Sequence, residues 1–172
     1  HYKKVLIEPA QSVRIGEPPE FETRPGVVDW ENRLTTIVSG VAEGHLLGGN
    51  LSLMVTLLGT PFEPQFEGAL LFLEDVDEPP YSVDRMLTHL WMAGRLEQVA
   101  GIVLGKFTDD GYDSNTFSME EVLRDRLEPL GIPALRGAMI GHIEDKTVVP
   151  LGVRARLDVD AGSLTLLEAA VS

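Results

Sequence analysis

Apolar residues are distributed differently in the first 25 residues and in the rest of the chain. Residues 1–25 hold a single short apolar run at 5–7 among prolines and other turn-forming residues, which predicts one strand within an irregular segment or linker. From residue 26 onward, apolar positions recur at the spacings of strands and helices. Residues 26–172 are therefore predicted to form one folded domain.

The middle of the chain predicts three strands that alternate with two helices. The apolar runs of these strands are continuous, which is typical of strands that are covered on both faces. One helix is indicated by apolar residues on a single face, and the other begins with a capping box of Ser118 and Glu121. The strands are expected at 68–73, 100–107 and 134–140, and the helices at 83–90 and 119–127. This order predicts parallel strands joined by crossover helices.

Alternating apolar and polar residues predict antiparallel hairpins on both sides of this middle part. One hairpin joins residues 34–38 to residues 42–47 through a short turn, and the other joins residues 153–159 to residues 164–166. Parallel and antiparallel signatures therefore coexist in one chain. Together they predict a mixed α/β domain with two sheets or a partly closed barrel.

A glycine-rich turn separates the first hairpin from the middle part. Gly48 and Gly49 are expected to end the strand, and Asn50 is a natural N-cap for a helix over residues 51–58. Gly59 then ends this helix. Ending a strand and capping a helix account for all three turn residues, so no catalytic part is assigned to them.

Composition and charge narrow the classes of function. The chain is 44% hydrophobic and 24% charged, as is ordinary for a globular domain. Its net charge of −13, without a cluster of Lys and Arg, disfavours nucleic acid and membrane surfaces as partners. Its apolar runs end well before the ~18–20 residues of a membrane span. The lack of cysteine excludes disulfides, thiolate zinc sites and a cysteine nucleophile, and with no leader-like start we expect a cytoplasmic protein.

Glu74 is the first candidate for chemistry, because it is the first polar residue after the strand predicted at 68–73. Ligands of α/β sheets usually bind at the carboxyl ends of the strands. A carboxylate at that place is held by a rigid element and is still open to a crevice. The alternative is that the acids at 74–78 form a solvated loop.

His142 is the second candidate, since it follows Gly141 at the end of the strand predicted at 134–140. A glycine lets another backbone or a substrate approach closely, and an imidazole that titrates near neutrality is the usual general base. One alternative is a loop histidine bonded to Glu144 or Asp145. Another is a metal site made of these three side chains, which would be a weak ligand set.

A glutamate and a histidine at two strand ends are two thirds of a charge-relay triad. The carboxylate orients the imidazole, and the imidazole takes the proton of a hydroxyl. None of the serines lies in the G-x-S-x-G setting of a strained nucleophile turn. Ser52 and Ser118 are assigned to helix beginnings, and no nucleophile is expected in this chain.

Three stretches of the chain carry a family resemblance. They are GVAEGHLLGGNLSLMVTLLGTP (40–61), GALLFLEDVDEPPYSVDRMLTHLWMAGRL (68–96) and GIPALRGAMIGHIEDKTVVPLGVRARLD (131–158). In this order and spacing they resemble the C-terminal domain of the LD-carboxypeptidases, serine peptidases of peptidoglycan recycling whose family includes the microcin C self-immunity peptidases. The likeness covers residues 26–172. It implies a three-layer β/β/α domain of swivelling type with mixed parallel and antiparallel strands.

The resemblance implies that two domains share one catalytic site. In this family the nucleophilic serine stands on an N-terminal α/β domain, and the Glu and the His of the triad come from the C-terminal domain. By motif these correspond to Glu74 and His142. The N-terminal domain has no counterpart in this chain, so the expected partners are a serine-bearing N-terminal domain and a murein peptide. The isolated chain is expected to be inactive.

The resemblance also implies a substrate class. LD-carboxypeptidases release the terminal D-alanine from murein tetrapeptide, and residues 73–90 are closer to this branch than to the immunity peptidases. No metal or organic cofactor is implied. Two alternatives stay open: an immunity-type peptidase that cleaves an aminoacyl-nucleotide conjugate, and a non-catalytic module for dimerisation or peptide binding. The sequence also leaves a homodimer open.

Overall fold

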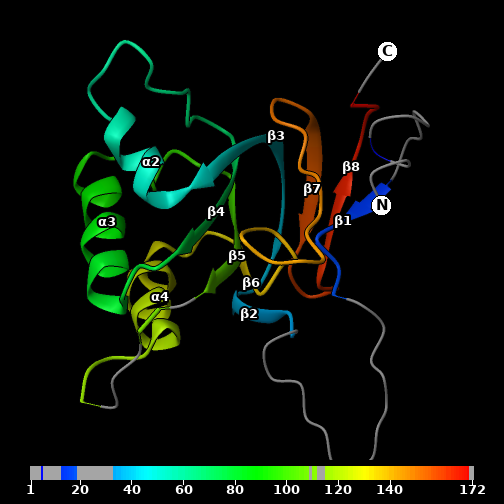
Figure 1. Ribbon diagram of the computed structural model, residues 1–172. Coiled ribbons are helices and arrows are strands. Elements are labelled where there is room, and N and C mark those ends of the chain that lie inside the picture. The colour runs from blue at the N-terminus through cyan, green and yellow to red at the C-terminus, as the bar shows by residue number, and fades with distance from the viewer. Residues whose placement is uncertain (1–4, 6–12, 19–32, 109, 112–114, 171–172) are drawn as a thin grey trace, which may run out of the picture.

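One sheet of eight strands, with α-helices on one side, makes up the described part of the chain (Figure 1). The computed structural model describes residues 5, 13–18, 33–108, 110–111 and 115–170. The strands are β1 (Val13–Ile15), β2 (Thr35–Val38), β3 (Val41–Asn50), β4 (Leu70–Val76), β5 (Gly101–Thr108), β6 (Ala134–Arg136), β7 (Arg154–Asp158) and β8 (Ser163–Leu166). The helices are α2 (Leu51–Leu57), α3 (Pro80–Met92), α4 (Met119–Leu127) and the short 3-10 helix η1 (Glu128–Leu130). None of the helices in these ranges is long and apolar enough to cross a lipid bilayer.

β3 joins the two halves of the sheet, in which the strand order is β1-β8-β7-β3-β4-β5-β6-β2. Its residues 41–45 pair antiparallel with β7, and its residues 46–50 pair parallel with β4. Gly44 stands near this change of partner, where a Cβ would come within 2.2 Å of the carbonyl oxygen of Gly68. Only a glycine allows β3 to come so close to the chain that leads into β4.

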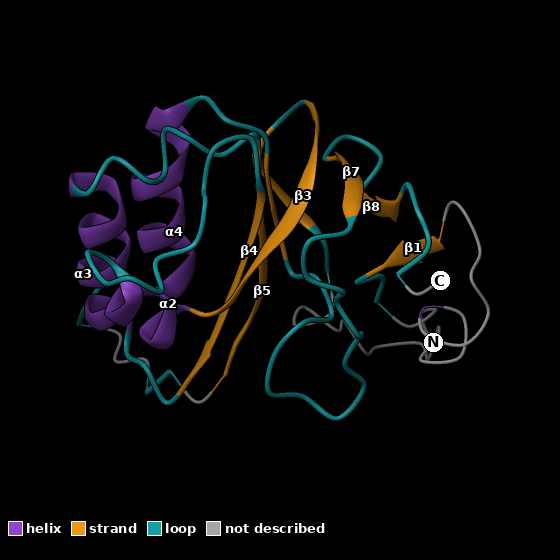
Figure 2. Cartoon of the chain, turned by 90° about the horizontal axis from the view of Figure 1, so that it is seen from above, coloured by secondary structure: helices purple, strands orange, loops and turns teal. Residues whose placement is uncertain are grey.

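The two halves of the sheet and the helices form three layers (Figure 2). β1, β7 and β8 lie on one side of the half that contains β4 and β5, and α2, α3 and α4 lie on its other side. A hydrophobic core fills each of the two spaces between the layers. This architecture confirms the predicted β/β/α domain with mixed parallel and antiparallel strands.

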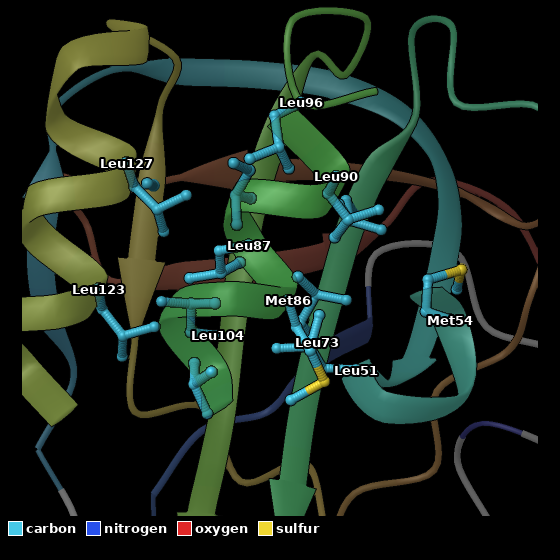
Figure 3. Packing of buried hydrophobic residues seen from close by; sticks show 14 of the residues in the cluster. Leu51, Met54, Leu73, Met86, Leu87, Leu90, Leu96, Leu104, Leu123 and Leu127 are labelled. Atoms are coloured by element: carbon cyan, nitrogen blue, oxygen red, sulfur yellow. The ribbon is translucent and has the colours of Figure 1, made fainter. Parts of the chain in front are cut away.

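Alternate residues of β4 and β5 enter the two cores, which explains the continuous apolar runs of these strands. Leu73 and Leu104 pack with the helices (Figure 3), whereas Leu70 and Val103 pack with the β7-β8 layer. Each fully buried leucine of this kind stabilises the fold by about 1.5–3 kcal/mol. Because side chains alternate along a strand, two consecutive polar residues on β4 must point to opposite layers.

The predicted hairpin between residues 34–38 and 42–47 is wrong. β2 pairs antiparallel with β6, whereas β3 pairs with β4 and β7. Alternation indicates a strand with one covered face, but it carries no information about which strand lies beside it. The C-terminal hairpin is confirmed by the pairing of β7 with β8, and the parallel middle part by the order β4-β5-β6.

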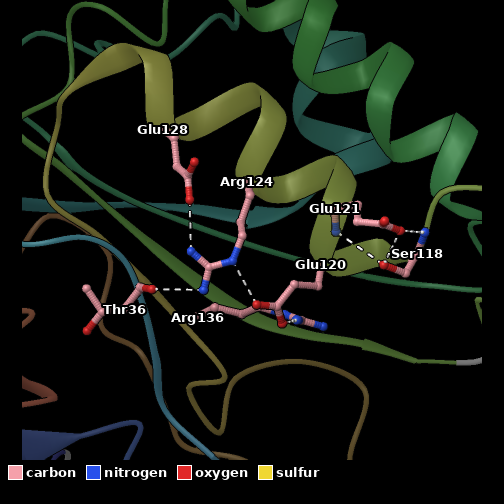
Figure 4. Close-up of polar contacts among 7 residues, drawn as sticks. All are labelled: Thr36, Ser118, Glu120, Glu121, Arg124, Glu128 and Arg136. Atoms are coloured by element: carbon pink, nitrogen blue, oxygen red, sulfur yellow. Dashed lines mark hydrogen bonds and ion pairs between the residues drawn. The ribbon is translucent and has the colours of Figure 1, made fainter.

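Polar contacts from α4 hold β2 at the edge of the sheet (Figure 4). Nη2 of Arg124 donates to the carbonyl oxygen of Thr36 at 3.1 Å, and the same guanidinium pairs with Glu120 and Glu128. The hydrogen bonds to Glu128 and Glu120 raise the pKa of Arg124. Arg136 of β6 also pairs with Glu120. Helix α4 is therefore linked to both strands of the β2-β6 pair.

β3 and β6 end at different residues than the sequence predicts. β3 runs beyond Gly48 to Asn50, and the glycine pair does not end it. A Cβ on Gly48, whose φ is +145°, would lie 1.8 Å from the carbonyl oxygen of Phe72, so this glycine serves the close approach of β3 to β4. β6 ends at Arg136. The next residue, Gly137, has a φ of +96° and turns the chain out of the strand.

The strand of the N-terminal segment lies at a different place than predicted. β1 pairs antiparallel with β8, and Ile15 is buried in the core between the two halves of the sheet. Val5, where the sequence predicts a strand, is helical and buried, and residues 6–7 lie outside the described residues. Residues 1–25 therefore contribute a strand to the sheet.

Candidate active site

Glu74 lies within β4, one residue after Leu73, which faces the helices. The sequence predicts the carboxylate directly after the strand, whereas β4 continues to Val76. The backbone of Glu74 is paired with Asn50, the last residue of β3. The residue is only 6% exposed. A buried carboxylate is stable only with hydrogen-bond partners, so the identity of its partner decides what it can do.

β5 contains a bulge opposite Glu74. The register between β4 and β5 passes from Leu73 opposite Leu104 to Asp75 opposite Phe107, so β5 has one more residue than β4 over this stretch. A bulge bends its strand and releases backbone groups from the regular ladder, and bulges are common next to active sites. Here the bulge frees the backbone of β5 to bond another segment.

The segment after β6 crosses this bulge and leads to the histidine. The N–H of Lys106 donates to the carbonyl oxygen of Ile140 at 2.8 Å. Gly105 permits the crossing, because a Cβ there would lie 2.3 Å from the same oxygen. The next two residues are Gly141 and His142. The bulge therefore anchors the segment that carries the imidazole, two residues before His142.

His142 and Glu74 form a hydrogen-bonded pair although 68 positions separate them, with Nδ1 of the imidazole 2.8 Å from Oε2 of the carboxylate. Gly141 has a φ of +130°, and a Cβ on it would lie 3.0 Å from that same oxygen. The glycine thus allows the close approach expected from the sequence. The structure brings the two candidate residues together, and the histidine bonds Glu74 instead of Glu144 or Asp145.

The two members of the pair differ strongly in exposure. The side chain of His142 is 56% exposed, and that of Glu74 is 8% exposed. An ionised carboxylate only accepts hydrogen bonds, so in a neutral ring this contact requires the proton on Nδ1 and leaves the lone pair on Nε2. The base nitrogen is thereby on the exposed ring, while the acid that orients it is buried. This arrangement can take a proton from a group brought to the surface of the domain.

Asp75 is a second buried carboxylate, and sequence reasoning missed it as a site residue. It is 2% exposed. It accepts from Nδ2 of Asn50 at 2.6 Å and from both the N–H and the hydroxyl of Ser52, at 2.9 Å and 2.8 Å. Asn50 also caps α2, as predicted, by accepting from the N–H of Leu53 at 3.1 Å. The signal in the sequence is a pair of consecutive acids on an apolar strand, because alternation gives each face one carboxylate.

The acids at 74–78 divide into a buried pair and a more exposed pair. Glu74 and Asp75 are buried, so the alternative of a solvated acidic loop does not describe them. Asp77 is exposed and Glu78 is partly exposed. Asp77 has a φ of +58°, in the left-handed region, at the point where the chain leaves β4.

Two serines have the structural roles that the sequence assigns to them. The hydroxyl of Ser52 lies 2.8 Å from Asp75 and 3.2 Å from Oε1 of Glu78, so its described partners are acids and not an imidazole. Ser118 caps α4, and both its N–H and its hydroxyl bond Glu121, at 2.8 Å and 2.7 Å (Figure 4). These bonds lower the pKa of Glu121. Among the described residues, the side-chain partners of both hydroxyls are carboxylates and not a histidine.

A metal site at His142, Glu144 and Asp145 has no support in the structure. The described residues contain no group of three or more His, Cys, Asp and Glu side chains that could hold a metal ion. The imidazole is instead directed to Glu74. Acid–base chemistry by this pair requires no further ligand at the histidine.

Comparison with known proteins matches most of the structure to one family. Residues 43–157, which include Glu74 and His142, match the family model of the LD-carboxypeptidase C-terminal domain. A probable murein peptide carboxypeptidase of Bacillus subtilis is 46% identical over 141 residues, which are 81% of this chain and 44% of that relative. The microcin C7 self-immunity protein of Escherichia coli is 28% identical over 140 residues, which are 81% of this chain and 41% of that protein.

A solved structure supports the same relationship. The crystal structure of muramoyltetrapeptide carboxypeptidase from Oxalobacter formigenes has a TM-score of 0.68 and 35% identity to this chain. The match covers 78% of this chain and 48% of the other. The chain therefore spans less than half the length of each of these three relatives.

Proposed function

The chain belongs to the LD-carboxypeptidase family as a C-terminal domain, and from this premise we propose that Glu74 and His142 are the acid and the base of a Ser-Glu-His triad. The serine would come from another domain of the full-length protein, as the resemblance implies. The observation that carries the proposal is the 2.8 Å contact between Nδ1 of His142 and Oε2 of Glu74. With Nδ1 bonded to Glu74, Nε2 of the largely exposed ring is the nitrogen left to take a proton from a nucleophile.

The first half of the reaction follows from this geometry. As the serine oxygen attacks the carbonyl carbon of the scissile peptide bond, Nε2 of His142 takes the hydroxyl proton and the ring becomes an imidazolium. Glu74 stays ionised and stabilises the positive ring through its bond to Nδ1. Because the carboxylate is buried, its attraction to the imidazolium is weakened less by water than that of an exposed acid.

The second half uses the same proton in the opposite direction. The imidazolium gives it to the leaving amine as the C–N bond breaks, which leaves an ester between the serine and the remaining peptide. Nε2 then takes a proton from water, the water oxygen attacks the ester carbonyl, and the serine leaves with that proton. His142 thus acts in turn as base and acid, and both residues return to their starting states.

The proposed substrate is a murein tetrapeptide, from which the enzyme releases the terminal D-alanine. Support comes from the names of two relatives, a probable murein peptide carboxypeptidase and a muramoyltetrapeptide carboxypeptidase, at 46% and 35% identity. The microcin C7 self-immunity protein is 28% identical. The higher identity to the murein enzymes favours the murein substrate over an aminoacyl-nucleotide conjugate.

We also propose that this domain acts only together with a serine-bearing domain, in the cytoplasm. The chain covers 44% of the Bacillus subtilis relative, which leaves room in that relative for such a domain. Both the covalent step and the hydrogen-bond donors for the oxyanion require groups beyond the Glu74–His142 pair. The 172-residue chain alone is therefore expected to release no D-alanine.

The test is D-alanine release from murein tetrapeptide by the full-length protein and its variants. In Glu74→Gln and His142→Ala, kcat should fall on the order of 10⁴-fold or more, because either change removes one half of the proton relay. His45→Ala is the matched control, since His45 lies on β3 with its ring 3.3 Å from the Gln65 carbonyl oxygen. If His142→Ala retains kcat within about tenfold while binding is intact, the domain is a non-catalytic module.

A further inference from the structure

Asp75 is a buried carboxylate beside the proposed catalytic pair, and no step of the reaction uses it. We propose that Asp75 is the positioning residue of this pair: its carboxylate ties together the ends of β3, β4 and α2, and thereby holds Glu74 where it can bond His142. This inference rests on the proposed function of Glu74 and His142. It adds a role for a residue whose described hydrogen bonds go to Asn50, Ser52 and Val76 and not to either of the two reacting side chains.

The contacts of Asp75 come from three elements. Oδ1 accepts from Nδ2 of Asn50 at 2.6 Å and from the N–H of Val76 at 2.9 Å. Oδ2 accepts from the N–H of Ser52 at 2.9 Å and from its hydroxyl at 2.8 Å. Each oxygen therefore has two donors, as a buried charge requires. The carboxylate connects the end of β3, the first turn of α2 and the end of β4.

Glu74 needs such support because the regular ladder is interrupted beside it. On one side its backbone is paired with Asn50 of β3. On the other side the β5 bulge replaces regular pairing, which resumes only at Asp75 opposite Phe107. β4 is thus held to β3 at Asn50, opposite Glu74, and it is held to β5 again at Asp75, the residue that follows Glu74. The side chains of Asn50 and Asp75 also bond one another, so the two supports act as one unit.

Replacing Asp75 by asparagine keeps the shape and breaks this arrangement. An amide has only one acceptor oxygen, and its NH2 group would face either the donors of Ser52 or the donors of Asn50 and Val76. Where the new NH2 group faces another donor, both buried donors lose their hydrogen bonds. The ends of β3, β4 and α2 then move apart. The end of β4 then loses its attachment, and the carboxylate of Glu74 shifts from Nδ1 of His142.

The tautomer of His142 reports this shift without any need for activity. In the neutral ring, the bond to Glu74 keeps the proton on Nδ1, whereas a ring that loses this bond is free to carry it on Nε2. Long-range ¹H–¹⁵N spectra of the 172-residue chain, recorded above the titration range of histidine, distinguish the two forms. The ring is assigned by its loss in His142→Ala. We expect mainly the Nδ1–H form in the unsubstituted chain and mainly the Nε2–H form in Asp75→Asn.

A reciprocal exchange tests whether the bond itself matters. Asn50→Asp combined with Asp75→Asn again places a carboxylate opposite an amide, and an aspartate at position 50 still caps α2. The double variant should recover at least half of the Nδ1–H form that Asp75→Asn loses. Asp84→Asn is the matched control, because Asp84 pairs with Arg126 on the helix layer, and it should leave the tautomer unchanged.

Activity gives a second readout in the full-length protein. Asp75→Asn should lower kcat by about tenfold to 100-fold with KM nearly unchanged, since a misplacement of about 1 Å costs on the order of 10²-fold. If Asp75→Asn does not fold, Ser52→Ala is used as the test variant in its place. This change removes the hydroxyl that donates to Asp75 and leaves the Asp75 carboxylate intact. Ser52→Ala should then shift the ring partly toward the Nε2–H form.

The outcomes separate the two proposals. An Nε2–H ring in the unsubstituted chain would overturn the Glu74–His142 pair and with it the proposed function. An Nδ1–H ring in the unsubstituted chain that persists in Asp75→Asn, or in Ser52→Ala where that variant is used, would overturn the positioning role alone. A tautomer that shifts equally in Asp84→Asn would also overturn it, because the effect would then be a general response to lost charge.

Discussion

Gly141 packs against Glu74 so closely that a Cβ on the glycine would lie 3.0 Å from Oε2 and 3.3 Å from Cβ of the glutamate. A third contact, at 3.3 Å, would involve the carbonyl oxygen of Lys106 in the β5 bulge. The backbone at Gly141 has a φ of +130°, which L side chains rarely adopt. The geometry of the proposed catalytic pair therefore depends on a residue that has no side chain.

Gly141→Ala should displace His142 from Glu74 and lower the activity of the full-length protein. The methyl group would compress the buried carboxylate, which β4 holds in place, so the histidine segment has to move. A displacement near 1 Å would reduce kcat on the order of 10²-fold. The measurement is D-alanine release, together with the tautomer of His142 in the 172-residue chain, which should shift from Nδ1–H toward Nε2–H.

Gly94→Ala controls for the backbone strain of this change. Gly94 has a φ of +70°, and apart from its own atoms and its two chain neighbours no heavy atom in the described part of the chain lies within 4 Å of a Cβ built on it. Its replacement should destabilise the fold by about 1–2 kcal/mol, as for other L residues in the left-handed region, and leave kcat unchanged. Equal losses of kcat in Gly94→Ala and Gly141→Ala would show that strain, and not contact with Glu74, is responsible.

Features with local signals could be predicted from the sequence. The cap of α4 needs only Ser118 and Glu121, and it is present as predicted. The hairpin of β7 and β8 is indicated by two alternating runs around a short turn, and the antiparallel pairing of these strands confirms it. Glu74 and His142 could be selected because each follows an apolar run, and the structure brings them within hydrogen-bond distance.

Features that depend on distant segments could not be predicted in this way. The partner of β3 is decided by how closely other backbones approach Gly44 and Gly48, and alternation contains no such information. The bulge in β5 depends on Gly105 meeting Ile140, a contact between segments that are far apart in sequence. Asp75 is an intermediate case. The sequence shows two consecutive acids, Glu74 and Asp75, but it does not show that β3 and α2 supply the hydrogen-bond donors of Asp75.

Leu87→Ala tests the core between the helices and the sheet. Leu87 lies on α3 in the cluster shown in Figure 3 and is 0% exposed. Its truncation should lower the free energy of unfolding by about 2–5 kcal/mol through lost burial and a residual cavity. Urea unfolding of the 172-residue chain measures this loss. Leu53→Ala, at an α2 position that is 67% exposed, should change it by less than about 0.5 kcal/mol.

A small effect of Leu87→Ala would contradict the three-layer packing. If the two variants lowered the free energy of unfolding equally, α3 would not be packed on β4 and β5 in solution. The proposed pair would then lack its rigid support, because the helices cover the face of β4 opposite to Glu74. The m-value should stay constant in both variants, so that a change of midpoint reports stability alone.

The capping box of α4 should make stability depend on pH. Bonds from the backbone and side chain of Ser118 lower the pKa of Glu121 below its ordinary value of 4.5. The folded state therefore binds this proton less readily than the unfolded state does, so the ionised carboxylate stabilises the fold above pH 4.5 and this contribution is lost as the pH falls through the folded-state pKa. Glu121→Gln keeps an acceptor for the cap but removes the charge. Its deficit in unfolding free energy should be largest near neutral pH and shrink below pH 4.5.

Urea unfolding over a series of pH values measures this difference. Glu97→Gln, a matched change of an exposed acid outside the capping box, controls for the loss of one negative charge from a chain of net charge −13. The difference between the two variants isolates what the charge of Glu121 adds to its bonds with Ser118, since both variants remove one negative charge from the same self-repelling surface. A deficit of Glu121→Gln that is the same at acidic and neutral pH would mean that the charge of Glu121 contributes nothing to the cap.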